Sequence, residues 1–305
     1  MLYDTIIAGG GPAGYSAALY LAMAGYKTLV IEKLADGGQM ALTDTIDNYP
    51  GFDEGISGFE LGQRMKKGAI RFGAETLYAE IDSISAMGDE KSVSAGGKEY
   101  KARSLIIATG ASPRRLGVPN ENELTGMGVH YCAHCDGRFY QGKTVAVVGG
   151  GNSALEDAAY LSKLAKEVIL IHRRGEFRAS RHNRERLKGL SNLRIMYSSS
   201  LSELTTDNGM LVGIKVRTAD GEETIRVDGV FISIGRTPES SLILGQVDTD
   251  ANGYIIADET TVTNIPGVFA AGDIRTKPLR QVVTAAADGA VSATRAEEYL
   301  GMKKF

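Results

Sequence analysis

Two cysteines with the spacing of a redox-active pair lie near the middle of the sequence. Cys132 and Cys135 are the only cysteines in the chain, and Asp136 follows them directly. Because two residues separate the sulfurs, one turn of chain can join them. In a reducing compartment such a pair is normally catalytic or part of a metal site. The pair therefore predicts either thiol–disulfide exchange or metal binding.

Neighbouring histidines make zinc the alternative. Zinc in proteins usually takes four ligands, and the sequence has no second Cys-x-x-Cys pair. His130 and His134 would complete a Cys2His2 set, but four ligands so close along the chain cannot easily reach tetrahedral positions. We therefore expect a redox dithiol, rather than zinc ligands or inert thiols, and no metal.

A glycine-rich turn at the start of the chain has the pattern of a dinucleotide-binding site. Residues 4–8 form an apolar run typical of a buried parallel strand, and a helix over residues 15–24 and a strand over 28–31, closing on Glu32, are expected to follow. Glycines permit the tight turn and the approach of a pyrophosphate, the helix N-terminus faces the phosphates, and the acid accepts from a ribose hydroxyl. The fingerprint residues are Gly9, Gly11 and Gly14.

A second unit of the same kind follows the cysteines. A strand is expected over residues 144–148, a helix over 153–163 and another strand over 168–171. The turn after the first of these strands matches GxGxxA, which again indicates a phosphate-binding loop at a helix N-terminus. Its fingerprint residues are Gly149, Gly151 and Ala154.

Basic residues replace the ribose-binding acid in this second unit. The segment reads His172, Arg173 and Arg174, with Arg178 shortly after. Losing the acid removes the ribose acceptor, and arginines supply planar donors for a 2′-phosphate. A solvated basic loop is the alternative, because the run over residues 178–188 is basic as well. We expect the site to prefer NADP(H).

The bulk properties exclude several classes of function. The chain is 43% hydrophobic with a formal net charge of −3, which gives no reason to expect binding to nucleic acid or to a membrane surface. A strand starts almost at Met1, which leaves no room for a signal peptide, and the apolar stretch at residues 15–26 is too short for a membrane span. Cytoplasmic localisation is expected.

Taken together, the motifs resemble the low-molecular-weight, bacterial-type thioredoxin reductases, and they do so from end to end. The motifs, in order, are GGGPAG at 9–14, DNYPG at 47–51, ATGA at 108–111, CAHCDG at 132–137, GGGNSA at 149–154, HRR with Arg178 at 172–178, and GD at 272–273 with RQV at 280–282.

This resemblance implies an α/β fold with two Rossmann-like dinucleotide-binding domains. The NADPH-binding domain, residues 114–245, would be inserted into an FAD-binding domain of residues 1–113 and 246–305. Segments 112–119 and 236–246 contain Pro and Gly and are expected to be linkers able to act as hinges. The resemblance further implies FAD, NADPH, a homodimer and thioredoxin as the protein disulfide substrate.

The resemblance also implies a role for individual residues. Asp136 would be the acid–base group, Cys135 would lie next to the flavin, and Cys132 would exchange with the substrate. Its cofactor-binding residues would be Gly9, Gly11, Pro12, Ala13, Gly14, Glu32, Gly38, Gln39, Asn48, Thr109, Gly110, Gly149, Gly151, Asn152, Ser153, Ala154, His172, Arg173, Arg174, Arg178, Gly235, Gly272, Asp273, Arg280, Gln281 and Val282.

Other functions fit parts of the pattern. A related reductase serving ferredoxin or flavodoxin, or a reductase for a peroxidase partner, is the nearest alternative, and a redox-sensing or nucleotide-binding module without turnover belongs to a different class. His134 is a departure from the family, which more often carries a smaller polar residue between the cysteines. A titratable imidazole at this position would alter thiolate populations or partner contacts.

Overall fold

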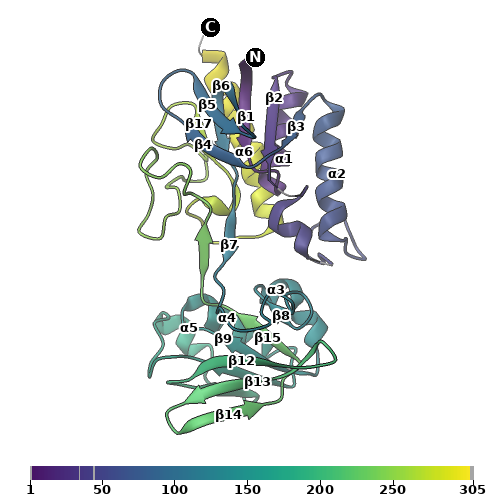
Figure 1. Cartoon of the computed structure of the whole chain (residues 1–305), viewed down its shortest axis with the longest axis vertical. Coiled ribbons are helices and arrows are strands. Elements are labelled where there is room, and N and C mark those ends of the chain that lie inside the picture. Colours follow the sequence, from purple (N-terminus) through teal and green to yellow (C-terminus); the bar gives the residue numbers. More distant parts are fainter. Residues whose placement is uncertain (1, 34, 44, 303–305) are drawn as a thin grey trace. The chain divides into compact units, whose positions relative to one another are not determined.

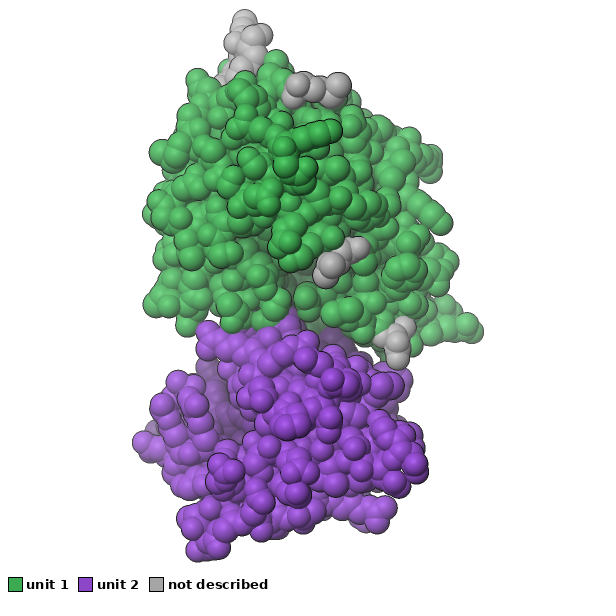
Figure 2. Space-filling view, in the orientation of Figure 1, with its two compact units in different colours: residues 1–112, 237–305 green, residues 113–236 purple. Residues whose placement is uncertain are grey.

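The computed structural model describes residues 2–302 except 34 and 44, and its chain divides into two compact units (Figure 1). Unit 1 consists of Met1–Ser112 with Thr237–Phe305, and unit 2 is the inserted segment Pro113–Arg236, shown in separate colours in Figure 2. Each unit has a parallel sheet packed against helices. The predicted α/β class with two dinucleotide-binding folds is confirmed.

Unit 1 is built on a seven-stranded sheet with the order β3-β2-β1-β6-β5-β4, in which β17 also pairs with β6. β1, β2, β3, β17 and the second half of β6 are parallel, whereas β4 and β5 add an antiparallel extension to the first half of β6. The strands are β1 (Leu2–Ala8), β2 (Thr28–Glu32), β3 (Glu75–Tyr78), β4 (Ile81–Ser85), β5 (Lys91–Ala95), β6 (Lys98–Ile107) and β17 (Val268–Ala270).

Apolar residues cover both faces of this sheet because its central strands are buried on both sides. In β1, Ile6 and Ala8 join one hydrophobic cluster and Ile7 joins the other, as the alternation of side chains along a strand requires. The helical elements are α1 (Pro12–Met23), η1 (Gly38–Leu42), α2 (Gly58–Arg71), η3 (Gly272–Ile274) and α6 (Val282–Met302). Among the residues that the structure describes, no helix has the length and apolar character needed to cross a membrane.

Unit 2 combines a five-stranded parallel sheet of order β11-β10-β9-β15-β8 with a three-stranded antiparallel sheet of order β12-β13-β14. Its helical elements are α3 (Ala133–Asp136), η2 (Gly137–Tyr140), α4 (Asn152–Leu161) and α5 (Arg181–Glu185). The strands are β8 (Val129–His130), β9 (Thr144–Val148), β10 (Glu167–Ile171), β11 (Leu193–Met196), β12 (Ser200–Asp207), β13 (Met210–Thr218), β14 (Gly221–Ile225) and β15 (Gly229–Ile232).

The second boundary between the units differs from the sequence-based prediction. The sequence placed it between residues 245 and 246, whereas the structure divides the chain at Arg236 and Thr237. Ile243 is buried in the core of unit 1, and Glu239 N donates to Gly110 O. Pro238 and Gly245 suggested a linker, but Ile243 lies within a hydrophobic cluster of unit 1 and Leu242 packs against that cluster. The connecting segments themselves pair as short strands, β7 (Ala111–Pro113) and β16 (Arg236–Pro238).

Candidate functional site

The two cysteines form a disulfide at the start of a short helix in unit 2. Cys132 is the N-cap residue of α3, with an extended backbone, and Cys135 lies one turn later, so their Cα atoms are 5.3 Å apart. Cys135 N and Asp136 N both donate to Cys132 O, at 3.3 and 3.1 Å. The turn therefore brings the sulfurs together and places Asp136 directly after them, as the spacing predicted.

A buried imidazole lies against the Asp136 carboxylate. His130 Nδ1 is 3.3 Å from Asp136 Oδ2, and His130 Nε2 forms a 2.6 Å hydrogen bond with Tyr140 Oη. The His130 side chain is only 6% exposed, against 19% for Asp136. Burial, with Asp136 and Asp228 adding to it, raises the pKa of Tyr140 to about 12. Sequence reasoning considered His130 only as a zinc ligand and missed this contact.

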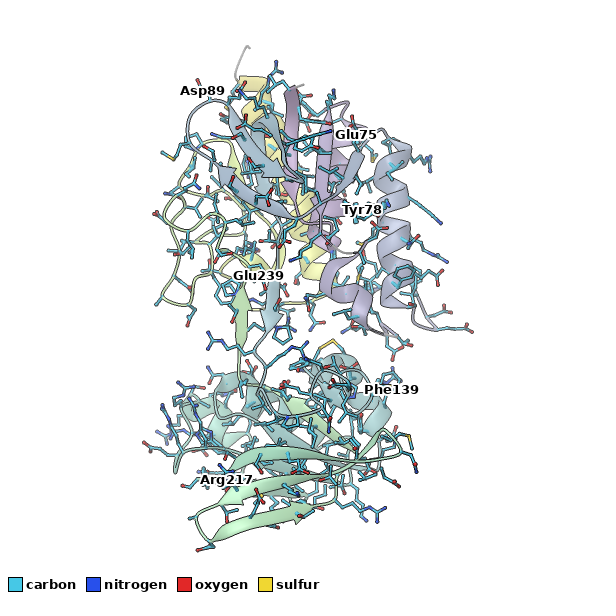
Figure 3. The ribbon with its side chains drawn as sticks, viewed as in Figure 1. Glu75, Tyr78, Asp89, Phe139, Arg217 and Glu239 are labelled. Atoms are coloured by element: carbon cyan, nitrogen blue, oxygen red, sulfur yellow. A yellow bond between two sulfur atoms is a disulfide. The ribbon has the colours of Figure 1, made fainter. Side chains whose placement is uncertain are left out.

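His134, between the cysteines, lies in a different environment. Its ring is exposed and rests on the Tyr160 ring, with 4.1 Å between the centroids. Nearby in α4, burial raises the pKa of Asp157, while the Ser233 hydroxyl and His134 oppose that rise. Phe139, labelled in Figure 3, lies four residues after Cys135 in η2 and is a large apolar side chain that is 49% exposed.

The first glycine loop, in unit 1, has the shape of a phosphate-binding turn. Gly9 has φ +106°, and a Cβ there would lie 2.4 Å from Ala108 O. A Cβ on Gly14 would lie 1.9 Å from Gly9 O, so α1 packs directly on the turn. In contrast, a Cβ on Gly11 would meet nothing among the described residues closer than Gly37 O at 3.9 Å. This open side adjoins the N-terminus of α1, which no side chain caps and whose first turn carries no acid.

Glu32 ends β2 next to this loop, as expected for a ribose-binding acid. Its Oε2 accepts from Gly10 N at 2.6 Å. Thr109 and Gly110 follow β6 at the same edge of the sheet, where Thr109 Oγ1 donates to Glu239 O at 2.7 Å. The predicted residues of the first nucleotide site therefore gather at the carboxyl ends of parallel strands, where open α/β sheets bind ligands.

Two loops that the sequence separates widely meet in unit 1. Asn48 Nδ2 donates to Gln281 Oε1 at 3.1 Å. Gly38 begins η1, which also carries Gln39, and a Cβ on Gly38 would lie 3.4 Å from Gly11 Cα. The structure thus brings the η1 turn to the first glycine loop.

The Gly272-Asp273 turn reaches the same region from the C-terminal part of the chain. Gly272 has φ +81°, and a Cβ there would lie 3.0 Å from Ala13 Cβ at the start of α1. Arg280 Nη2 donates to Arg275 O at 3.2 Å, and Val282 is the first residue of α6. Gly272 therefore lies against the start of α1, and Arg280 is bonded to the segment that follows the Gly272 turn.

The second glycine loop, in unit 2, repeats the arrangement. Gly149 has φ +155°, and a Cβ there would lie 2.4 Å from Ser233 O and 2.6 Å from Ala154 Cβ. A Cβ on Gly151 would meet no described atom within 4 Å, which leaves space over the uncapped N-terminus of α4. Asn152 Oδ1 accepts from Ser180 N at 2.8 Å and so ties this loop to the basic segment.

The basic segment follows β10, as the sequence predicted. Arg173, Arg174 and Arg178 are exposed, and Arg178 N donates to Gly150 O at 3.0 Å. His172 is buried with Nε2 2.9 Å from Glu176 O, and its ring fills the space that a Cβ on Gly150 would need. Gly235, with φ +105°, follows β15 at the same edge of the sheet.

Comparison with known proteins assigns the chain to a family. The model of the pyridine nucleotide-disulphide oxidoreductases matches residues 3–289. The chain belongs to that family. Thioredoxin reductases of Listeria monocytogenes and Bacillus subtilis are 46% and 44% identical to it, over 98% of this chain and 94% and 95% of theirs.

Solved structures agree with this assignment. The crystal structure of thioredoxin reductase from Streptococcus pyogenes superposes with a TM-score of 0.92 at 40% identity and covers 99% of both chains. Thioredoxin reductase from Giardia duodenalis gives a TM-score of 0.91 at 35% identity, also over 99% of both chains. The resemblance expected from the motifs is confirmed.

This pyridine nucleotide-disulphide oxidoreductase has a buried acid, Asp36, beside its first glycine loop, and sequence reasoning did not assign it to the site. Tyr15 and Tyr78, the latter labelled in Figure 3, donate to Asp36 Oδ1, and Lys66 Nζ donates to Oδ2 at 3.2 Å. Burial raises the pKa of Asp36, but these donors outweigh burial and hold the pKa below its ordinary value. Gly37 N donates to Gly10 O at 2.9 Å, so this cluster anchors the loop against the glycine turn.

A second buried acid stabilises the turn at Gly272. Asp288 in α6 accepts from Gly272 N at 2.9 Å, from Arg275 Nε and Nη2, both at 2.8 Å, and from Lys277 Nζ at 2.8 Å. Burial raises the pKa of Asp288, but the hydrogen bonds from Arg275 and Lys277 outweigh burial and lower the pKa. The signal in the sequence that could have indicated this role is an acidic residue within an otherwise Ala-rich helix.

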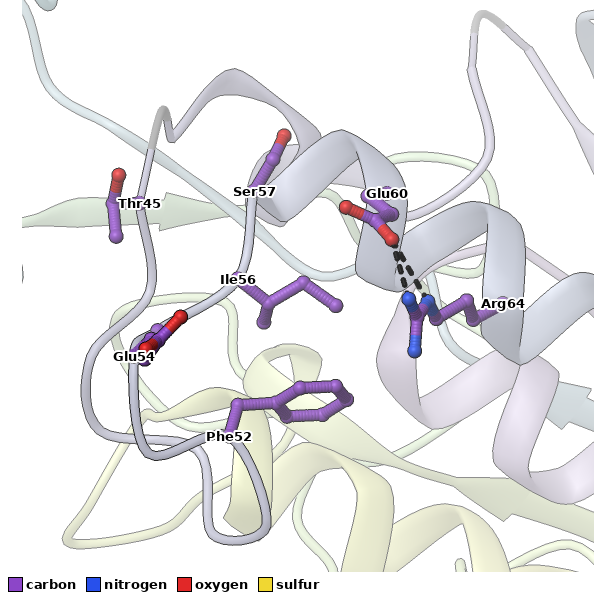
Figure 4. A pocket seen from close by; sticks show the side chains of 8 residues that line it. Thr45, Phe52, Glu54, Ile56, Ser57, Glu60 and Arg64 are labelled. Carbon is purple, nitrogen blue, oxygen red and sulfur yellow. Dashed lines mark hydrogen bonds and ion pairs between the residues drawn. The ribbon is translucent and has the colours of Figure 1, made fainter.

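A shallow hollow near α2 lies among residues that the sequence did not single out (Figure 4). Glu60 and Arg64 pair along α2 on one side, and the Phe52 ring lies 5.7 Å from the Arg64 guanidinium. None of the eight residues that line it belongs to the predicted site.

Proposed function

We propose that this family member is an NADPH-dependent flavoprotein disulfide reductase whose substrate is thioredoxin. Electrons would pass from NADPH through FAD and the Cys132/Cys135 pair to the substrate disulfide. The observation that carries the proposal is the disulfide between these cysteines, followed directly by a carboxylate, in a chain with two dinucleotide-type glycine loops. Full-length relatives that bear the name thioredoxin reductase support it.

Unit 1 fits FAD. The open side of Gly11 and the uncapped N-terminus of α1 suit a pyrophosphate, and Glu32 is positioned at the end of β2 to accept from a ribose. When bound, the flavin accepts a hydride and passes on two electrons. We assign the remaining contacts to Gly38, Gln39, Asn48, Thr109, Gly110, Asp273, Arg280, Gln281 and Val282.

Unit 2 fits NADPH. Gly151 leaves room at the N-terminus of α4, and three exposed arginines follow β10 where an NAD site would carry an acid. Guanidinium groups form bidentate hydrogen bonds with phosphate oxygens. We assign recognition of the 2′-phosphate to Arg173, Arg174 and Arg178.

The cysteines would exchange with the substrate in two steps that conserve electrons. The Cys132 thiolate attacks one sulfur of the thioredoxin disulfide, forms a mixed disulfide and expels a thiolate. Cys135 then attacks Cys132 Sγ, which releases the second substrate thiolate and restores the Cys132–Cys135 disulfide. The two protons that the Cys132 and Cys135 thiols give up go to the two expelled substrate thiolates, and Asp136 is the group placed to carry them, one in each step. We further propose that the enzyme is a cytoplasmic homodimer, on the resemblance alone.

Reoxidation of the loaded enzyme tests this function. Purified protein should carry FAD, lose its flavin absorbance on anaerobic addition of NADPH, and regain it when a bacterial thioredoxin disulfide is added. Cys135→Ser, as the matched control, should still be reduced by NADPH but should not pass electrons to thioredoxin. Reoxidation by ferredoxin, flavodoxin or a peroxidase partner, with none by thioredoxin, would assign the chain to one of the alternative reductases.

A further inference from the structure

The environment of Asp136 adds a residue to the proposed reaction. We propose that His130 is a positioning residue for Asp136: its buried imidazole, held by Tyr140, presents Nδ1–H to the Asp136 carboxylate and fixes that side chain beside the dithiol. This inference rests on the proposed function, because it assumes that Asp136 handles the protons of thiol exchange.

Strand pairing places the imidazole. His130 lies in β8 opposite Phe231 of β15, and the two rings stack with 5.3 Å between centroids and 27° between planes. Tyr140 meets the same two rings edge-on, at 5.3 and 5.4 Å. Phe231 is fully buried and Tyr140 is 7% exposed, so the imidazole has one packed orientation rather than several.

The two partners of the imidazole, the Tyr140 hydroxyl and the Asp136 carboxylate, together decide which ring nitrogen carries the proton. Tyr140 keeps its hydroxyl proton at neutral pH, since burial raises its pKa to about 12. A hydroxyl that donates to Nε2 leaves the proton of a neutral imidazole on Nδ1. That nitrogen lies 3.3 Å from Asp136 Oδ2. The opposite tautomer would set a lone pair against the carboxylate, so the packed ring and the tyrosine together select an N–H donor toward Asp136.

Backbone geometry alone leaves the carboxylate free to rotate. Asp136 is the last residue of a helix of one turn, and its N–H is used by Cys132 O. Its side chain is mostly buried, and a buried carboxylate needs a donor. His130 Nδ1, 3.3 Å from Asp136 Oδ2, is the group that we assign as this donor, and it lies on a strand, which is more rigid than the turn that carries Asp136.

Four variants test the role: His130→Leu, which removes both nitrogens, His130→Asn, which keeps an N–H near the Nδ1 position, Tyr140→Phe, and the exposed-histidine control His182→Asn. Each is made in the wild-type and Asp136→Asn backgrounds, with FAD bound. We expect His130→Leu to lower kcat with thioredoxin roughly tenfold or more without raising KM, and to leave flavin reduction by NADPH unchanged. His130→Asn should recover most of the loss, and Tyr140→Phe should fall between the two.

The double variants distinguish a positioning role of His130 from a role in packing alone. If His130 acts through Asp136, His130→Leu should cost less than about twofold in the Asp136→Asn background. Any of three results would overturn the proposal. The losses from His130→Leu and Asp136→Asn could add fully, the effect of His130→Leu could be confined to KM, or His130→Asn could be no more active than His130→Leu. If His130→Leu fails to fold, the Asn and Tyr140→Phe variants carry the same comparison. A wild-type enzyme that does not reduce thioredoxin would instead refute the proposed function, whatever His130 does.

Discussion

Asn48 Nδ2 donates to Gln281 Oε1 across 3.1 Å, although the two residues lie 233 positions apart in the sequence. Asn48 lies in the loop before α2, and Gln281 directly precedes α6. The hydrogen bond therefore joins the two segments of the chain that make up unit 1, one before and one after the inserted unit 2. Both residues are ones to which the resemblance gave flavin contacts.

Replacing Asn48 or Gln281 with Ala should weaken FAD retention by roughly threefold to tenfold, because each change removes a polar side chain to which the resemblance gives a flavin contact. When both residues are changed, the loss of FAD retention should be smaller than the sum of the two single losses. Equilibrium dialysis of the bound flavin measures the effect. Ser202→Ala removes a comparable side-chain hydrogen bond in unit 2 and should leave retention unchanged. Normal retention in the double variant would remove both residues from the flavin site.

Arg173→Ala with Arg174→Ala should raise the KM for NADPH by roughly 10²-fold while changing activity with NADH little. The reason is that the side chains bind a phosphate that NADH lacks. Steady-state kinetics with both nucleotides provides the measurement. Arg186→Ala, an exposed arginine in the same basic stretch, is the matched control. Equal losses with both nucleotides would make the arginine pair structural and support the solvated-loop interpretation.

Asp136→Asn should slow thioredoxin turnover by about 10²-fold and leave flavin reduction by NADPH intact, because an amide cannot deliver a proton to a departing thiolate. Stopped-flow measurement of the two half-reactions separates these steps. Glu156→Gln, which also changes a carboxylate of unit 2 but in α4, is a control for the loss of charge. Near-normal turnover in the Asp136 variant would assign this carboxylate to the structure of the turn.

Asp288→Asn should destabilise unit 1 by about 3–5 kcal/mol at neutral pH, because it leaves the buried Arg275 and Lys277 charges without their shared carboxylate. The pKa of Asp288 is lowered in the folded state, so its contribution is present above the ordinary pKa of about 4 and is lost as pH falls below that value. Urea titrations at several pH values measure both effects.

A control on the same helix makes this test specific. Arg295 and Glu298 form an exposed ion pair on α6, and Glu298→Gln should cost less than about 1 kcal/mol. The Asp288 variant should also lose the acid-dependent part of the wild-type stability profile. A destabilisation as small as that of the control would mean that the buried cluster adds nothing to the stability of unit 1.

The glycine loops and the dithiol were predictable because their chemistry is local. A Gly-x-Gly turn, the helix that follows it and a Cys-x-x-Cys pair each lie within a few residues, and the constraints on φ at Gly9 and Gly149 belong to the turn itself. The arginines after β10 were found in the same way, by their offset from a strand. The assignment of ligands to these residues, and the role of the linkers as hinges, remain predictions.

Only the tertiary structure decided which side chains support those motifs. Asp36, Asp288 and His130 are each visible in the sequence. The residues next to them in the chain do not indicate that their neighbours in the fold are Tyr78, Gly272 and Phe231, respectively. A buried acid or imidazole acquires its function from the donors, acceptors and rings that packing brings to it, and packing depends on contacts between strands and helices far apart in the chain. The sequence by itself therefore determined the two nucleotide folds and the reactive pair, while the fold determined which buried polar groups hold them in place, because burial is a property of the whole core.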